Sequence, residues 1–163
     1  MNYCGIDTGT KQVTAAIIGD ILQADGTYKL EYIDSFEVPA PELTHQGTEQ
    51  LRSMLSCVDR GLVEYCDYTL NAGVVANLNL QAGYLAGKLN FALIGAGEWQ
   101  GHKRGGFAGN PDACHILKSL GIEGREVVSK NTRRIEWRNS TRKLTKHEWD
   151  AIGLAFYASG RKV

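Results

Sequence analysis

Two aspartates at opposite ends of the chain constrain the fold more than any other feature. Asp7 closes an apolar stretch and is followed by Thr8 and Gly9, so it is predicted to end a short buried strand. Asp150 lies in the opening turn of the last predicted helix, three residues after His147. A fold that joins these two ends buries two acids at one site, and metal binding is the usual reason for such burial.

The size and composition of the chain indicate an ordinary globular protein. Its 163 residues suit one compact domain, and we expect a single domain over residues 1–163. No apolar run approaches the length of a membrane span, and the start has no signal-peptide pattern, so we expect an intracellular protein with no membrane partner. The four cysteines are widely spaced and form no C-x-x-C, which disfavours a zinc site and disulfides.

Charge is unevenly spread although the net charge is zero. Residues 1–100 hold 5 Lys and Arg against 12 Asp and Glu, whereas residues 101–146 hold 11 Lys and Arg against 4 Asp and Glu. This asymmetry favours a basic surface for a polyanion beside an acidic region that suits metal ions. The alternative is a solvated face on which the charges mix in three dimensions.

Hydrophobic periodicity and turn residues predict an α/β fold with a sheet of about five strands. Three antiparallel strands come first, and strands and helices alternate afterwards. The predicted strands cover residues 2–7, 12–22, 28–38, 67–75 and 90–94. The predicted helices cover residues 51–58, 77–89, 110–121 and 146–158, and residues 95–109 are predicted to be an irregular loop.

The last predicted helix begins with a capping box. Thr145 is a good N-cap and Glu148 follows three residues later, so Glu148 is interpreted as structural. His147 and Asp150 share one face of the first turn, and that face continues through apolar residues. Taken alone, Asp150 is equally compatible with a favourable interaction with the helix N-terminus, and His147 with a surface position.

Both ends together carry a family resemblance. Gly5-Ile6-Asp7-Thr8-Gly9 and His147-x-x-Asp150-Ala151-x-x-Leu154-Ala155, with the predicted order of elements, resemble the RuvC family of Holliday junction resolvases within the RNase H-like superfamily, in particular small phage-type members. The resemblance covers most of the chain, although residues 95–109 and 122–143 match only in general character. It implies an RNase H-like fold with a mixed five-stranded sheet flanked by helices, and the cytoplasm of a bacterial or phage-infected cell.

The resemblance also implies a metal-dependent endonuclease that cuts four-way or other branched DNA. In the family, acids on the first strand, the fourth strand and the last helix hold two Mg²⁺ or Mn²⁺ ions. Carried over, Asp7 and Asp150 are metal ligands, and His147 takes the other last-helix position. Two such ions clamp the scissile phosphate, one activating water and one stabilising the leaving oxygen.

The sequence departs from the family pattern at the fourth strand. The family has a glutamate there, whereas the predicted strand over 67–75 offers Asn71 as the catalytic and metal-binding residue. An engineered inactive variant, a natural pseudo-nuclease, or an active enzyme with an acid from elsewhere would each fit, and Glu64 and Asp67 lie nearby. If Asn71 fills the position, Asn71→Glu is expected to raise cleavage.

Basic residues in the second half are predicted to bind the DNA phosphates, with Trp99, Phe107 and Trp137 interleaved for stacking or wedging. These basic residues are Lys103, Arg104, Arg133, Arg134, Arg138, Arg142, Lys143 and Lys146. Core packing is the alternative for the aromatic residues. A homodimer would supply two symmetric cuts, and the helix over 77–89, with Ala82, Ala86 and Gly87, is the predicted contact.

Two other functions remain open at the level of sequence. Because Asn71 stands where the family has a glutamate, the chain could also be a catalytically inactive protein that binds junction DNA. The stretch from Gly5 to Lys11 also resembles the phosphate-binding hairpin of the actin, sugar-kinase and Hsp70 superfamily. Those proteins need two RNase H-like lobes around ATP, and this chain is long enough for one.

Overall fold

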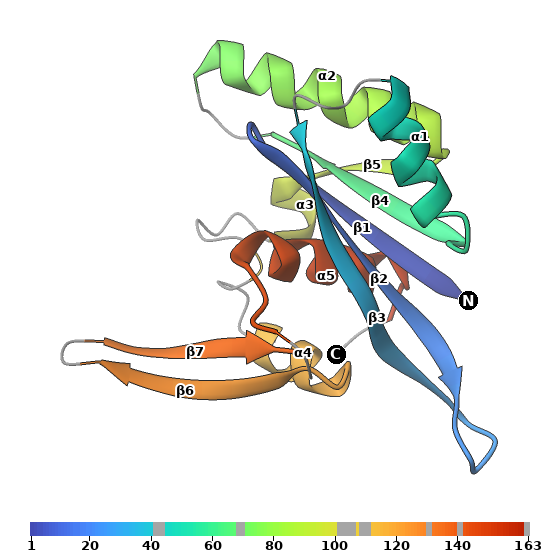
Figure 1. The fold of residues 1–163 in the computed structure, drawn as a ribbon, viewed down its shortest axis with the longest axis vertical. Helices are drawn as coiled ribbons and strands as arrows, with labels where there is room; N and C mark the ends of the chain where they lie inside the picture. The colour runs from blue at the N-terminus through green and yellow to red at the C-terminus, as the bar shows by residue number, and fades with distance from the viewer. Residues whose placement is uncertain are drawn as a thin grey trace.

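The computed structural model of the chain describes residues 1–40, 45–67, 71–100, 107, 112–129, 132–139 and 142–161. Figure 1 shows the elements in chain order. They are β1 (Asn2–Thr8), β2 (Gln12–Leu22), β3 (Tyr28–Pro39), α1 (His45–Met54), β4 (Arg60–Tyr65), α2 (Ala72–Leu89), β5 (Ala92–Gly95), α3 (Ala96–Gln100), α4 (Ala113–Ser119), β6 (Glu123–Ser129), β7 (Thr132–Arg138) and α5 (Lys146–Ala158).

The central sheet has five strands in the order β3-β2-β1-β4-β5. β1, β2 and β3 pair antiparallel, whereas β4 runs parallel to β1 and β5 runs parallel to β4. The prediction of a mixed five-stranded sheet is therefore confirmed. β1 is central and buried on both faces, which explains its nearly continuous apolar sequence.

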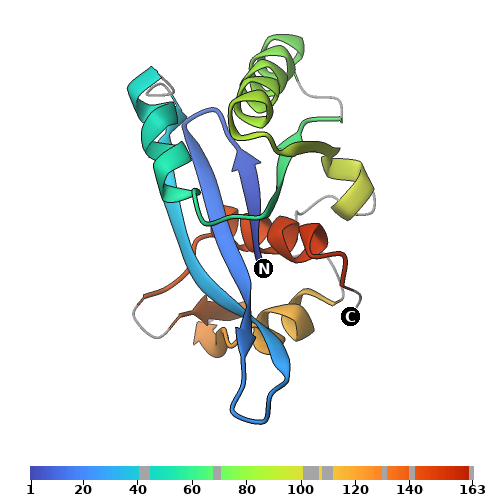
Figure 2. The ribbon, with the colours of Figure 1, turned by 90° about the vertical axis from the view of Figure 1, so that its right-hand side faces the viewer.

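Helices cover both faces of this sheet (Figure 2). Cys4 and Ile6 of β1 point into the core under α1 and α2, together with Leu51 and Leu85 from those helices. The alternate residues of β1 face α5. A Cβ on Gly5 would lie 2.1 Å from the Ala151 carbonyl oxygen, so only glycine lets α5 approach β1 this closely.

A second, two-stranded sheet is formed by β6 and β7 and projects away from the main body (Figure 1). These two strands are additional to the five that the sequence predicts. Trp137 is buried at the base of the hairpin, and its carbonyl accepts a hydrogen bond from the Leu144 N–H. The hairpin is thus anchored to the segment that leads into α5.

The prediction of a fourth strand over residues 67–75 is wrong. The fourth strand is β4, which ends at Tyr65, and Asn71 is the N-cap of α2, where its side chain accepts a hydrogen bond from the Gly73 N–H at 3.0 Å. Val74 and Val75 favour strands by propensity, but here they lie in the first turns of a helix whose start Asn71 specifies. The predicted loop over 95–109 is also wrong at its start, because α3 begins at Ala96.

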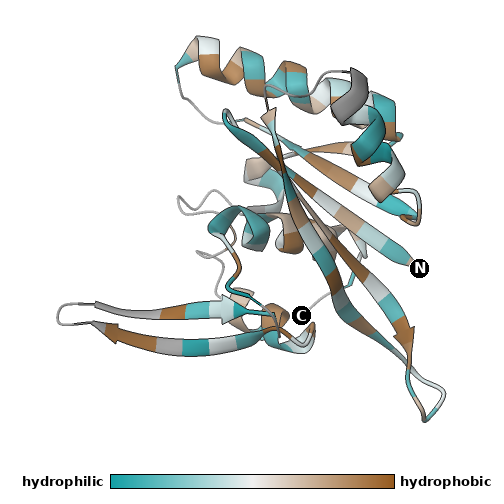
Figure 3. Cartoon of the chain, in the orientation of Figure 1, coloured by the Kyte–Doolittle hydropathy of each residue, from teal (hydrophilic) through white to brown (hydrophobic). Residues whose placement is uncertain are grey.

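α2 packs on the sheet through the small residues that were predicted to form a dimer contact. Ala82 and Ala86 are buried in the core of their own chain, so that part of the prediction is wrong. The outer face of α2 carries Leu80, which is 75% exposed, and the exposed Tyr84. Figure 3 shows apolar segments along the whole length of α2.

No helix in the described ranges has both the length and the apolar character that a membrane span requires.

Candidate active site

Asp7 lies near the end of β1 and faces α5, because it is two residues beyond Gly5 on the same side of the strand. Its side chain is buried, and its Oδ2 lies 2.7 Å from Nδ1 of His147 in the first turn of α5. The two ends of the chain therefore meet, as the sequence predicts. They meet because α5 packs directly across β1.

His147 lies at the rim of this site. Its side chain is 50% exposed, in contrast to that of Asp7. The hydrogen bond to Asp7 raises the pKa of the imidazole, and the negative charges of Asp7 and Asp150 act in the same direction against the opposing effect of burial. The raised pKa favours the protonated, positively charged form of His147 beside the buried Asp7 carboxylate.

Asp150 is buried on the same face of α5, one turn after His147. Its Oδ1 accepts a hydrogen bond from the Phe107 backbone N–H at 2.5 Å. Burial, and then the nearby charge of Asp7, raise the pKa of Asp150 to about 6, although the Phe107 N–H opposes the shift. Two carboxylates are therefore held close enough to repel each other.

Glu64 supplies a third carboxylate that the sequence prediction placed outside the site. The parallel register pairs Ile6 with Val63, so Asp7 and Glu64 are the next residues along two adjacent strands. Glu64 is buried, its carbonyl accepts a hydrogen bond from Thr8 Oγ1, and its Oε2 accepts one from Trp99 Nε1 at 2.7 Å. Asn71, by contrast, is exposed at the start of α2.

The sequence did contain a signal for Glu64. The run Gly61-Leu62-Val63-Glu64-Tyr65 is a short apolar strand with one acid near its end, the same pattern as in β1. The predicted helix over 51–58 ends just before this run and the predicted strand over 67–75 begins just after it, so the prediction placed the fourth strand several residues too late. Asp67, the other nearby acid, accepts hydrogen bonds from the Gly97 N–H and caps the start of α3 instead.

Glu148 lies between His147 and Asp150 but has a structural task, as predicted. The capping box with Thr145 is present, and Glu148 also accepts hydrogen bonds from Arg142 and from Ser35 Oγ on β3. Burial alone would raise the pKa of Glu148, but these hydrogen bonds and the Arg142 charge lower it below its usual value. This network fixes the first turn of α5, and with it both site residues.

The predicted DNA-binding residues fall into three groups. Arg142 pairs with Glu148, and Lys143 pairs with Glu136 at 2.7 Å, so a DNA phosphate would have to compete with these carboxylates for the two cations. Arg138 at the base of β7 and Lys146 at the start of α5 are exposed. The remaining positions lack a description: Lys103 and Arg104 lie outside the described residues, and Arg133 and Arg134 are placed on β7 by their backbone only.

The aromatic residues that were predicted to interleave with the basic residues are in the core instead. Trp99, Phe107 and Trp137 are 7%, 2% and 4% exposed, so none can stack on a base in this conformation. The Trp99 and Phe107 rings contact each other, with centroids 6.1 Å apart. Core packing, the alternative left open from sequence, is the correct one.

The donor chemistry of this site fits divalent metal ions of the Mg²⁺ type. Asp7, Glu64 and Asp150 offer hard oxygen ligands on three elements that face one another. Burial, and then the charge of Asp7, raise the pKa of Asp150, and a bound cation would favour the ionised form of that carboxyl group. Within the described ranges, however, no three Asp, Glu, His or Cys side chains are already spaced as a ligand cluster.

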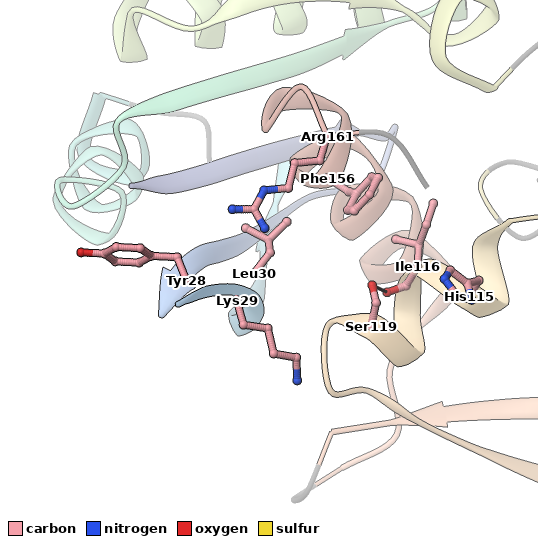
Figure 4. Close-up of a pocket in the computed structure, with 8 residues that line it drawn as sticks. All are labelled: Tyr28, Lys29, Leu30, His115, Ile116, Ser119, Phe156 and Arg161. Atoms are coloured by element: carbon pink, nitrogen blue, oxygen red, sulfur yellow. Dashed lines mark hydrogen bonds between the residues drawn. The ribbon is translucent and has the colours of Figure 1, made fainter. Parts of the chain in front are cut away.

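A shallow hollow elsewhere has no link to these carboxylates. It has a volume of about 360 Å³ and lies between the start of β3, α4 and the end of α5 (Figure 4). Phe156 lines it two helical turns beyond Asp150. Its cations are already paired, Arg161 with Asp20 and Lys29 with Glu31, so it offers no free charge from these two residues.

Comparisons with known proteins show what this fold resembles. No protein-family model matches the sequence, and no curated protein sequence matches it. The structure does match RuvC of Thermus thermophilus in complex with a Holliday junction substrate, with a TM-score of 0.63 and 16% identity over 98% of this chain and 96% of that one. A second Thermus thermophilus RuvC structure matches with a TM-score of 0.55 and 15% identity, over 95% and 90% of the two chains. A fowlpox virus resolvase bound to Holliday junction DNA also matches, with a TM-score of 0.42 and 11% identity over 97% and 99%.

The chain has the RuvC-type RNase H-like fold. The first two matches cover nearly the whole of both chains, so the likeness is to the fold of the chain as a whole. The fold predicted from the two terminal motifs is therefore confirmed. At this level of identity the likeness establishes fold, and the activity has to be argued from the site.

Proposed function

We propose that this chain is a metal-dependent endonuclease that resolves four-way DNA junctions. The observation that carries the proposal is the burial of Asp7 and Asp150 where β1 packs against α5, with a third buried acid, Glu64, at the adjacent position of β4. Burying three acids from distant parts of the sequence costs free energy, and buried acids of this kind are concentrated at functional sites. The likeness to a RuvC bound to a Holliday junction substrate supports branched DNA as the substrate.

In this proposal the three carboxylates hold two Mg²⁺ or Mn²⁺ ions. When bound, such ions position the scissile phosphate and lower the pKa of a coordinated water. The protein contributes the rest. The capping network of Glu148 fixes the angle of α5, and the packing of α5 on Gly5 fixes its distance from β1.

His147 is proposed to act at the exposed rim of the site. Its hydrogen bond to Asp7 raises the pKa of the imidazole, which favours the protonated form, and a protonated imidazole can donate to a phosphate oxygen. Lys146, one residue earlier, is exposed beside it. DNA is proposed to enter from this side, past the hairpin base that carries Arg138.

The junction has two strands to cut, so we propose that the protein works as a homodimer. An isologous pair of subunits presents two identical sites related by a two-fold axis. The outer face of α2, with Leu80 and Tyr84, replaces Ala82 and Ala86 as the proposed contact, because it is apolar and exposed.

The test is nicking of an end-labelled four-way junction with Mg²⁺, with Mn²⁺ and with EDTA. Asp7→Asn and Glu64→Gln should each lower cleavage at least about 100-fold, which corresponds to roughly 3 kcal/mol in the transition state. Asn71→Glu should give no gain, contrary to the expectation from sequence, because Asn71 caps α2. A parent protein that binds junctions and cuts none with either metal would overturn the nuclease proposal.

That outcome would favour the second candidate, a silent junction-binding protein. Its original support was the apparent loss of the fourth-strand acid, and the position of Glu64 removes that support. The kinase-type alternative is weaker still, since the described fold forms one RNase H-like lobe. Binding of ATP by the purified chain would restore it.

A further inference from the structure

We infer that Trp99 is a positioning residue for Glu64, holding the carboxylate in the orientation in which it binds metal. The inference rests on the proposed function and extends it to a residue outside the acid set. Trp99 Nε1 donates a hydrogen bond of 2.7 Å to Glu64 Oε2, and both side chains are buried. A neutral donor orients a carboxylate without cancelling the charge that a metal ion needs.

α3, which carries Trp99, is tied to the end of β4 by a separate set of contacts. Both carboxylate oxygens of Asp67 accept from the Gly97 N–H, at 3.0 and 2.9 Å. A Cβ on Gly95 would lie 2.5 Å from Asp67 Oδ2, so a larger residue there would displace this carboxylate from its position. Asp67, two residues beyond the end of β4, therefore holds the short helix that supplies the donor for Glu64.

The ring of Trp99 is wedged against the helix that bears Asp150. A Cβ on Gly153 would lie 2.8 Å from the Trp99 ring and 2.6 Å from the Phe107 ring. Phe107 in turn donates its N–H to Asp150 at 2.5 Å. Two neighbouring aromatic residues thus deliver one donor to each of two acids, and both depend on a glycine one turn beyond Asp150.

This arrangement explains why an indole occupies a position where any large apolar side chain would fill the core. Phenylalanine would keep most of the packing and lose only the N–H. Trp137 offers a matched control, because it is equally buried in the same core cluster and donates to none of the three acids among the described contacts. Trp149 offers an internal reference, since its Nε1 is buried and has no hydrogen-bond partner in the part of the chain that is described.

The first experiment uses the metal-free full chain and does not depend on activity. The indole N–H region of its NMR spectrum contains signals from three tryptophans, and Trp99→Phe identifies that of Trp99. We expect Glu64→Gln to shift this signal upfield and to leave the Trp149 signal unchanged. Mg²⁺ should move the Trp99 signal in the parent protein and not in Glu64→Gln.

The second experiment measures how much Mg²⁺ each variant needs. Trp99→Phe should raise the Mg²⁺ dissociation constant, measured by calorimetry, by about 10- to 100-fold, which is the usual effect of losing a partner of a metal ligand. The Mg²⁺ concentration for half-maximal junction cleavage should rise in parallel, with unchanged junction affinity in EDTA. Trp137→Phe should leave both values at those of the parent.

The outcomes separate the two proposals. A Trp99 signal that ignores both Glu64→Gln and Mg²⁺ overturns the positioning role, as does an equal Mg²⁺ requirement in Trp99→Phe and Trp137→Phe. If the parent cuts no junction while its Trp99 signal responds to Mg²⁺ through Glu64, the nuclease proposal fails and the positioning role stands.

Discussion

Asp150 has a pKa that the fold shifts strongly. Burial and the charge of Asp7 raise its pKa from an ordinary 3.8 to about 6 in the folded protein. The folded chain therefore binds this proton more tightly than the unfolded chain does. Between about pH 4 and pH 6 the contribution of Asp150 to the free energy of unfolding falls as pH rises, and above that range the ionised group destabilises the metal-free fold.

Asp150→Asn should consequently stabilise the metal-free protein at pH 8, by on the order of 1–3 kcal/mol, and change it little at pH 4. The amide oxygen can still accept from the Phe107 N–H. Urea unfolding in EDTA at pH 4, 6 and 8 measures the difference. The pKa of His147 is also raised, so its contribution to the free energy of unfolding also falls as pH rises. Because His147 is present in both proteins, this contribution is common to the two unfolding curves. A variant that is less stable than the parent at pH 8 would contradict the account of Asp150.

Asn71 is expected to matter for stability and not for chemistry. Its side chain accepts the Gly73 N–H at the start of α2, and removing such a cap costs about 1 kcal/mol. Asn71→Ala should lower the free energy of unfolding by that amount and leave junction cleavage unchanged, whereas Asn71→Asp should keep the cap. Loss of cleavage in Asn71→Ala with full stability would return Asn71 to the active site.

At the scale of elements, the sequence predicts those whose local signals agree. β1 is an apolar run that ends in a turn, and α5 is an amphipathic stretch that begins with a capping box. The predicted bounds of both elements agree with the structure to within a residue or two. β4 was missed because its apolar run is short and because Val74 and Val75 beyond it favour a strand. In the structure these two valines lie in α2, which begins directly after its N-cap Asn71, despite their preference for strands.

Tertiary contacts account for the rest of what the sequence did not predict. Arg142 stands in a basic run and looks free, but it pairs with Glu148 because Ser35 of β3 completes a buried network around that acid. Trp99 and Trp137 are flanked by charged or polar residues, yet packing against α5 and α4 decides their burial. Site residues on α5 were predictable because the motif is local, whereas Glu64 needed the parallel register of two strands.

The β6–β7 hairpin is the element on which the proposed DNA contact depends. Replacing Arg133, Arg134 and Arg138 together by alanine should weaken junction binding and flatten its salt dependence by up to about 0.9 per lost phosphate contact in the log–log slope. Binding is measured by fluorescence anisotropy across a salt series. Arg52→Ala is the control, since Arg52 lies on α1 over the opposite face of the sheet. An unchanged slope in the triple variant would move the DNA path away from the hairpin.

At the scale of the whole molecule, the division of charge follows the architecture. The acidic first 100 residues form the sheet and the helices α1 to α3, whereas the basic part supplies α4, the hairpin and the lead into α5. The carboxylates lie where the two parts meet, since Asp7 and Glu64 come from the first and α5 follows directly from the second. A polyanion attracted by the basic part would therefore reach the acids at its edge.

The proposed homodimer is also a property of the whole molecule, because cutting both strands of a two-fold symmetric junction requires two active sites. In the dimer that we propose, the two copies of α2 would meet near the two-fold axis. Leu80, exposed beside Tyr84 and the small residues Gly83 and Gly87, would then face its own copy. Leu80→Glu brings two like charges together across that axis and should weaken self-association at least about tenfold, or more than 1.4 kcal/mol. Sedimentation at micromolar concentration, with and without junction DNA, measures this. Leu22→Glu, at a similarly exposed leucine at the end of β2, is the control and should leave the sedimenting mass of the protein unchanged. If both variants stay dimeric, the subunits pair through another face.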